Sequence, residues 1–371
     1  MRTQNISNLK QRLLILTALF LIAFSTTLLA QENCTFIKPN NTKIQIEGSN
    51  YIKMDGNELV IHRHSDAIYK GTTKTNLFNP NKARSSSGII LKFKTSSPLV
   101  KVKLKMMPGG KRGPVFAIFQ NNEFVRNKNF KYQPDTEITL NLVASKAGEA
   151  IEYKIAFPTF TDIHLLGLEL EKGFDIVAFP EEEKPTYVAF GDSITHGTGQ
   201  STTPETYPYL LAEKFGYELF NVAVGGGKTS QVLAEMIRDD FKNIELITVL
   251  IGFNDYNGEG IDIKTYEKRY TKVLSTLREK HPNTNIVCIS LLTTKAKTSK
   301  KTGIAAKDFR KVVSTVVANK QAKGDTKLYL INGASITTEA DLRDIVHLSP
   351  QGATNFADKL YHKINTIVKN K

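Results

Sequence analysis

The sequence predicts two domains, an all-β sandwich followed by an α/β domain built on a parallel sheet. Residues 87–106 alternate apolar and lysine residues at period two, which is typical of strands with one buried face. After Pro185, short apolar runs alternate with helical segments, which indicates parallel strands covered by helices. Several of these runs end in glycine beside a polar residue, as turns at the carboxyl ends of strands do.

The first half is expected to contain short strands and no long helix from Thr42 to about Leu170. Asn121 and Asn122 join two of these strands as a hairpin. Repeated short strands of this kind favour an antiparallel sandwich. The expected strands are residues 87–94, 99–106, 115–120, 123–125, 137–142, 151–156 and 163–170.

The second half is expected to alternate strands and helices up to a terminal helix, which Ser349 caps and Pro350 opens. In such sheets ligands bind outside the carboxyl ends of the strands. The expected strands are 187–190, 219–224, 246–251, 286–292 and 328–332, and the expected helices are 204–215, 229–241, 263–280 and 305–320.

Four stretches at or after the strand ends carry residues that could take part in catalysis. The first strand ends in Gly-Asp-Ser at Ser193, and the second run leads to three glycines that include Gly226. The third run ends just before Asn254, and Asp344 stands three residues before His347. The first turn is not the Gly-x-Ser-x-Gly elbow of α/β-hydrolases, because threonine occupies position 195.

These residue types together indicate nucleophilic catalysis. An acid three residues before a histidine can orient the imidazole, and the imidazole can then activate a serine hydroxyl. The Ser193 backbone N–H, the Gly226 N–H and the Asn254 amide are candidate donors to a tetrahedral oxyanion. The alternative is a structural turn serine beside an ordinary loop histidine; His196 and His281 are interpreted as bystanders.

The four stretches resemble those of the SGNH (GDSL-type) hydrolase superfamily, over roughly residues 185–370. The resemblance implies a flavodoxin-like three-layer α/β/α domain and no cofactor. It also implies Ser193 as nucleophile, His347 as base oriented by Asp344, and Gly226 and Asn254 as oxyanion partners. The first half, through its strand at residues 87–94 and the domain order, is similar to the jelly-roll module of carbohydrate esterase family two.

The N-terminus has the features of a secretory signal peptide. Cations at Arg2, Lys10 and Arg12 precede an apolar run, and cleavage is expected after Ala30. The run is shorter than the ~20 residues of a membrane span, so an exported protein, periplasmic or secreted, is expected. The expected segments are 1–30 signal peptide, 31–172 sandwich, 173–185 linker and 186–371 hydrolase domain.

The net charge of +14 falls to about +11 when the three cations of the leader are removed. The positive charge of an exported chain could favour binding to anionic polymers, or it could serve only solubility. The sequence has no nucleic-acid-binding motif, so DNA and RNA are not expected partners. Lysines follow the fourth expected strand; a solvated loop is favoured there over recognition of an anionic glycan. These residues are Lys295, Lys297, Lys300 and Lys301.

Metal chemistry is not expected from the spacing of metal-ligating residues. The two cysteines, Cys34 in an expected tail and Cys288 in a buried strand, form no zinc motif. His62 and His64 lie two apart on a strand but lack a third ligand in the sequence.

The predicted function is an exported serine esterase that removes small acyl groups, acetyl foremost, from carbohydrate. The expected partner is therefore an acylated carbohydrate, neutral or anionic, and the sequence does not specify an oligomeric state. A lipase or arylesterase of the same superfamily is the first alternative, because a fold does not select a substrate. An inactive glycan-binding protein is the alternative from another class.

Overall fold

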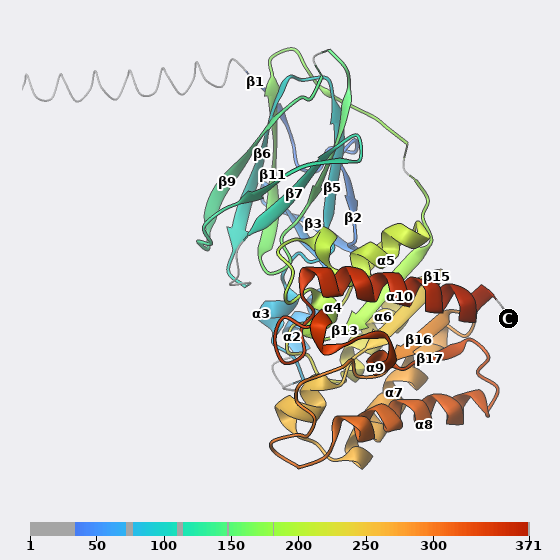
Figure 1. Ribbon diagram of the computed structural model, residues 1–371. Coiled ribbons are helices and arrows are strands. Elements are labelled where there is room, and N and C mark those ends of the chain that lie inside the picture. The colour runs from blue at the N-terminus through green and yellow to red at the C-terminus, as the bar shows by residue number, and fades with distance from the viewer. Residues whose placement is uncertain (1–33, 72–76, 110–113, 147, 181, 370–371) are drawn as a thin grey trace, which may run out of the picture.

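The computed structural model describes residues 34–71, 77–109, 114–146, 148–180 and 182–369 (Figure 1). The predicted signal peptide lies outside these residues. Among the helices described, none is both long and apolar enough to cross a membrane. An antiparallel β-sandwich stands above a three-layer α/β domain, which confirms the predicted fold.

The sandwich is formed by two antiparallel sheets that enclose an apolar core. Strand β6 shows the predicted alternation, because Val102 and Leu104 are buried whereas Lys101 is exposed. The first sheet runs β3 (Tyr51–Asp55), β4 (Glu58–His62), β11 (Asp162–Glu171), β6 (Leu99–Met107), β9 (Thr136–Val143), with β1 (Cys34–Ile37) also on β11. The second runs β12 (Ile176–Val177), β5 (Ile90–Thr95), β10 (Ile151–Ala156), β7 (Val115–Gln120), β8 (Glu123–Asn129), with β2 (Gln45–Glu47) also on β5.

The sandwich extends beyond its predicted strands at both ends. Cys34 is not in a tail, because it begins β1 and pairs with β11. The predicted linker contains β12, which pairs with β5 and buries Ile176. Two short helices, α2 (Asp66–Gly71) and α3 (Pro80–Ala83), were not predicted; each is too short for a helical period to show in the sequence.

The second domain has a five-stranded parallel sheet in the flavodoxin-like order. Its strands, in spatial order, are β14 (Glu218–Asn221), β13 (Thr186–Gly191), β15 (Ile244–Leu250), β16 (Asn285–Ile289) and β17 (Leu328–Ile331). Helices α5 (Tyr207–Phe215) and α10 (Pro350–Lys369) pack together, as do α6 (Gln231–Asp240), α7 (Ile263–Lys280) and α8 (Ala306–Gln321), and the two groups cover opposite faces (Figure 1). The strands are almost wholly buried because helices cover both faces.

Short helical segments complete the second domain at the carboxyl ends of its strands. They are α4 (Ser193–His196), η2 (Thr203–Glu205), η3 (Asn254–Glu259), α9 (Gly333–Ile336) and η4 (Glu339–Asp341). Strand β14 ends at Asn221, earlier than predicted, although the N–H groups of Val222 and Val224 still donate to the β13 carbonyls of Ala189 and Gly191 before the glycines at 225–227.

The two domains share a buried junction, where α2 and α3 lie between the sandwich and the parallel sheet (Figure 1). The Arg63 guanidinium, 2% exposed, donates to the carbonyls of Asn221 and Ala223 in the second domain and to those of Ala83 and Ser85 in the first. Hydrogen bonds to a charged group are worth about 1.5–3 kcal/mol each when buried. The sandwich therefore holds the segment that leads from β14 into the glycine loop.

Candidate active site

Ser193 lies where strand β13 ends and the short helix α4 begins. Asp192 forms the N-cap of α4, and its Oδ1 accepts the Ile194 N–H at 3.1 Å. A β-carbon on Gly191 would lie 2.1 Å from Thr195 Oγ1, so only glycine allows this close turn. The chain therefore makes a tight turn from β13 into α4, and this turn presents the Ser193 side chain at the edge of the sheet.

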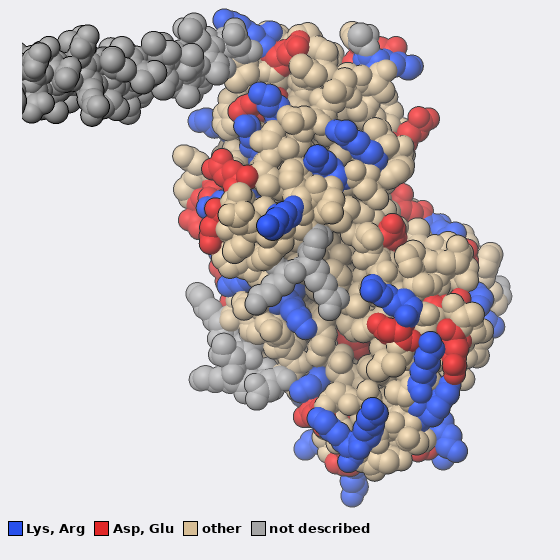
Figure 2. Space-filling view, turned by 60° about the vertical axis from the view of Figure 1, so that its left-hand side comes forward, with Lys and Arg blue, Asp and Glu red and all other residues tan. Residues whose placement is uncertain are grey.

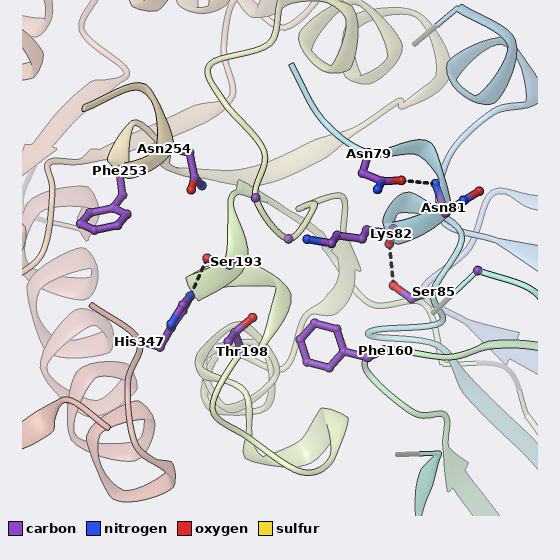
Figure 3. Close-up of a pocket in the computed structure, with 13 residues that line it drawn as sticks. Asn79, Asn81, Lys82, Ser85, Phe160, Ser193, Thr198, Phe253, Asn254 and His347 are labelled. Carbon is purple, nitrogen blue, oxygen red and sulfur yellow. Dashed lines mark hydrogen bonds between the residues drawn. The ribbon is translucent and has the colours of Figure 1, made fainter. Parts of the chain in front are cut away.

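Ser193, His347 and Asp344 form one hydrogen-bonded chain. Ser193 Oγ lies 2.8 Å from His347 Nε2, and His347 Nδ1 lies 2.8 Å from Asp344 Oδ2 (Figure 3 shows the first contact). A carboxylate at Nδ1 holds the ring proton there and leaves Nε2 free to accept the serine proton. This arrangement can activate the Ser193 hydroxyl as a nucleophile.

The Asp344 carboxylate is held as an anion. Partial burial tends to raise its pKa, but the N–H groups of Val346 and His347 and the His347 ring outweigh burial and lower the pKa below its usual range. Asp344 is therefore ionised throughout the neutral range. Its side chain is nevertheless 43% exposed, whereas that of His347 is 21% exposed.

Backbone contacts fix the loop that carries the acid and the base. The Arg343 N–H donates to the His347 carbonyl at 2.8 Å, which closes the loop on itself. On its outer side, the Ile345 carbonyl accepts the Lys295 N–H at 2.9 Å and the Thr294 hydroxyl at 2.8 Å. The start of the lysine loop thus supports the His347 loop through its backbone.

The predicted oxyanion partners line the same cavity as Ser193. Gly226 has φ +80°, a left-handed conformation that favours glycine. Asn254 Nδ2 donates to the Gly227 carbonyl at 2.9 Å, which fixes the amide and leaves its second hydrogen for another acceptor. Asp255 supports this arrangement by accepting the N–H and hydroxyl of Thr229 on Oδ2. The geometry suits oxyanion donation, which stays a prediction.

We expect Asn254→Ala to lower kcat by about 10²–10³-fold, the cost of removing one donor to a tetrahedral oxyanion. The measurement is the hydrolysis rate of p-nitrophenyl acetate. Asn127→Ala, an exposed asparagine on β8 of the sandwich, is the matched control and should behave as wild type. A change confined to KM would assign Asn254 to substrate positioning instead.

Both domains line the cavity above Ser193, which has a volume of about 440 Å³. From the second domain come Ser193, Thr198, Gly225, Gly226, Phe253, Asn254 and His347, and from the first come Asn79, Asn81, Lys82, Ser85, Gly109 and Phe160. Lys82 extends from α3 toward the glycine loop (Figure 3). A β-carbon on Gly226 would lie 3.6 Å from Lys82 Nζ, so this ammonium group stands beside a predicted oxyanion partner.

Sequence reasoning missed this contribution of the first domain. Asn79 followed by Pro80 is a helix-start signal, and the Asn79 side chain does accept the Asn81 N–H. That signal could have located α3 in the sequence. It could not have shown that Lys82 crosses the domain junction, because only tertiary packing decides that.

The predicted lysine loop does not reach the cavity in this structure, since none of its four lysines is among the lining residues. Lys297 Nζ pairs with Glu339 at 2.6 Å, and Lys301 Nζ donates to the Gly258 carbonyl. On the face shown in Figure 2, basic side chains are spread over both domains and interspersed with acidic ones. A role of this loop in substrate recognition stays a prediction.

His196, interpreted as a bystander to the chemistry, has a structural role beside the site. The ring is fully buried, its Nδ1 accepts the Gly225 N–H at 2.8 Å, and its Nε2 donates to the Thr159 carbonyl at 2.7 Å. Burial lowers its pKa well below the usual value, so the ring is neutral. Phe160 stacks on it with centroids 4.6 Å apart. His196 therefore connects the glycine loop to the sandwich.

Residues 189–354 match the model of the GDSL-like Lipase/Acylhydrolase family. A sequence search of curated proteins found no match. Among solved structures, the chain is similar to the salicylyl-acyltransferase SsfX3 from a tetracycline biosynthetic pathway, with TM-score 0.76 and 20% identity over 90% of this chain and 97% of that one.

Two further solved structures share the two-domain fold. A family two carbohydrate esterase from Cellvibrio japonicus has TM-score 0.65 and 16% identity, over 91% of this chain and 98% of that one. An acetyl xylan esterase from the rumen bacterium Butyrivibrio proteoclasticus has TM-score 0.63 and 15% identity, over 91% and 99%. At these identities the likeness shows the fold. The family match identifies residues 189–354 as a GDSL-like lipase/acylhydrolase domain, and this domain holds the Ser193, His347 and Asp344 arrangement of a carboxylic ester hydrolase.

Proposed function

We propose that this chain is an exported serine esterase that hydrolyses O-acyl esters, acetyl esters foremost, on carbohydrate. The observation that carries the proposal is the hydrogen-bonded chain from Asp344 through His347 to Ser193, which opens into a cavity walled by both domains. The proposed export rests on the charged and apolar segments of the leader at residues 1–30.

The geometry gives each residue a step in the proposed reaction. Ser193 Oγ attacks the ester carbonyl carbon while His347 Nε2 takes its proton, and the carbonyl oxygen becomes an anion facing Gly226 and Asn254. The carbon–oxygen bond to the sugar then breaks, and His347 gives its proton to the departing sugar oxygen, which leaves as a hydroxyl. Water, deprotonated by His347, finally attacks the acyl-enzyme and releases the acid and free Ser193.

The sandwich side of the cavity can bind a polar leaving group. The sandwich contributes two amides and an ammonium group, from Asn79, Asn81 and Lys82, and these groups can bind sugar hydroxyls. A long acyl chain laid against them would bury polar groups without hydrogen bonds, which costs free energy. Phe160 and Phe253 offer apolar surface at the same cavity.

The similar structures support the same substrate class, since one is a carbohydrate esterase and another is an acetyl xylan esterase. The acyltransferase among them shares the fold, and a transferase differs from a hydrolase in passing the acyl group to an acceptor other than water. Acetate released into water therefore separates the proposed hydrolase from a transferase.

The proposal is tested by incubating the mature chain with acetylated oligosaccharides and, separately, with medium-chain p-nitrophenyl esters. We expect acetate release from the oligosaccharides, with a higher kcat/KM than fatty acid release. A preference for medium-chain esters would favour the lipase alternative. Binding of the oligosaccharide without turnover of either substrate would indicate a glycan-binding protein.

Lys82 provides a test of whether the substrate is anionic. On a carboxylated or sulfated acetyl glycan, Lys82→Met should raise KM about tenfold, since a hydrogen bond to a charged group contributes about 1.5 kcal/mol. The KM of Lys82→Met should also depend less on salt, because it has lost one screened attraction. Replacing Lys295, Lys297, Lys300 and Lys301 by serine is the matched control and should leave KM unchanged.

The reverse result would locate the substrate-binding site at the lysine loop. A raised KM in the four-serine variant, with none in Lys82→Met, would show that the bound glycan leaves the cavity toward Lys297 and its neighbours. If neither variant changes KM, the substrate is neutral and the positive charge of the chain serves solubility.

A further inference from the structure

Three buried polar side chains gather in the sandwich domain. They are His62 at the end of β4 and Asp162 and His164 on β11, with exposures of 5%, 2% and 6%. Leu59 pairs with Leu165 in antiparallel register, which places position 62 opposite position 162. Because side chains alternate along a strand, position 164 shares their face.

This face is not the one that packs in the sandwich core. The neighbouring positions Ile61, Ile163 and Leu165 point into that core, so His62, Asp162 and His164 point the other way. His64 does not join them, because its ring lies in the domain junction between the carbonyls of Ala83 and Val222. Strand pairing therefore supplies His62 with two further potential ligands, Asp162 and His164.

The three groups converge without bonding to one another. One ligand atom from each lies within 4.8 Å of the other two. His62 Nε2 lies 4.0 Å from Asp162 Oδ2, and His164 Nε2 lies 4.0 Å from Asp162 Oδ1, too long for hydrogen bonds. A zinc ion with bonds of about 2.0–2.2 Å needs each side chain to move inward by less than about 1 Å.

Buried atoms in this cluster lack hydrogen-bond partners. Among the described residues, His62 Nε2 and Asp162 Oδ1 have none, and neither does the hydroxyl of Tyr69, whose ring packs edge-on against His62 at 5.0 Å. Buried polar atoms are normally paired, because leaving them unpaired costs stability. Here His62 and Asp162 belong to a cluster whose ligand atoms all lie within 4.8 Å of one another, which suggests that a ligand satisfies their unpaired atoms.

His164 is oriented as a metal ligand would be. Its Nδ1 lies 2.8 Å from Glu58 Oε2, and Glu58 is in turn bound by Lys105. The Glu58 carboxylate holds the ring proton on Nδ1, so the lone pair of Nε2 faces Asp162. A carboxylate behind a histidine is the usual outer partner of a metal-bound imidazole.

Two guanidinium groups, those of Arg84 and Arg63, lie near Asp162, and each has a partner of its own. Arg84 stacks on the Tyr69 ring at 4.4 Å, and Arg63 donates to carbonyls of the domain junction.

We propose that His62, Asp162 and His164 bind a divalent transition-metal ion, zinc foremost, in the sandwich domain. Two imidazoles and one carboxylate suit zinc, whereas magnesium and calcium prefer oxygen ligands. The ion would join β4 to β11 one residue from Arg63, and so stabilise the domain junction. It has no part in the proposed reaction at Ser193, so either proposal can fail without the other.

The test is metal binding by the mature chain after removal of metals with a chelator. We expect one Zn²⁺ per chain by calorimetry, visible absorption bands when Co²⁺ replaces it, and no binding of Mg²⁺. Zn²⁺ should raise the Tm of the wild type. Glu58→Gln should weaken Zn²⁺ about 10–100-fold, the usual effect of an outer partner, and Asp162→Asn, of the same shape, should weaken it further.

Two control variants locate the ion. His362→Ala removes an exposed imidazole on α10 and should bind Zn²⁺ as the wild type does. His347→Ala removes the imidazole beside Ser193 and should also retain binding. The proposal is overturned if the wild type binds neither Zn²⁺ nor Co²⁺, if Asp162→Asn binds as tightly as wild type, or if His347→Ala loses the ion. Circular dichroism and p-nitrophenyl acetate hydrolysis establish that Asp162→Asn is folded.

Discussion

Replacing Ser193 by alanine should lower kcat for p-nitrophenyl acetate by about 10⁴–10⁶-fold, the range for loss of an activated serine nucleophile. The hydroxyl is the group that His347 Nε2 contacts at 2.8 Å, and alanine leaves no oxygen there to attack the ester. The fold should persist, because the side chain is only partly buried and the turn is held by Gly191 and Asp192.

Ser201→Ala is the matched control, an exposed serine on the loop that follows Gly199, and it should keep full activity. Circular dichroism and Tm establish that both variants fold. If Ser193→Ala retains more than about one per cent of kcat, a loss far below that of a missing nucleophile, then Ser193 does not form the acyl-enzyme.

His347→Ala should lower kcat almost as far as Ser193→Ala, because the serine and its base act as one unit. Asp344→Asn should be about 10–100 times less damaging than His347→Ala, since the acid only orients and stabilises the imidazole. Its 43% exposure also lets water partly replace its stabilisation of the imidazolium. Rates of p-nitrophenyl acetate hydrolysis by both variants check this order.

Equal activity of Asp344→Asn and wild type would indicate a serine–histidine dyad, and equal loss in Asp344→Asn and His347→Ala would contradict the ranking. The lowered pKa of Asp344 adds a pH criterion. The stability that its ionisation contributes is present above the usual carboxyl pKa and is lost as pH falls through the lowered value. Protonation of Asp344 should therefore not shape the activity profile near neutral pH.

The parallel sheet and the serine, histidine and acid were predictable because their determinants are local. Apolar runs that end in glycine mark the carboxyl ends of parallel strands, and topology then brings those ends to one edge. Asp344 reaches His347 within three residues, so the sequence alone implied their contact. Helix α7 begins and ends where its apolar periodicity predicts.

The sandwich side of the cavity was not predictable, because it depends on contacts between distant segments. Lys82 stands beside Gly226 where the two domains meet, and the hydrogen bonds of Arg63 and His196 cross this junction. The lysines after β16 follow a strand end, where residues of the active site are expected. Lys297 nevertheless pairs with Glu339 outside the cavity. The cluster around Asp162 likewise arises from strand pairing across a separation of 100 residues, which no local pattern encodes.

Rapid-quench peptide mapping during turnover of an acetylated oligosaccharide tests most directly whether this chain is a serine esterase acting on carbohydrate. Acid quenching before the steady state should reveal one acetyl group on the peptide that contains Ser193, with free acetate appearing afterwards. In Ser193→Ala both the acetylated peptide and the acetate should be absent. An acetyl group on another side chain, or undiminished acetate release by Ser193→Ala, would contradict the proposed acyl-enzyme.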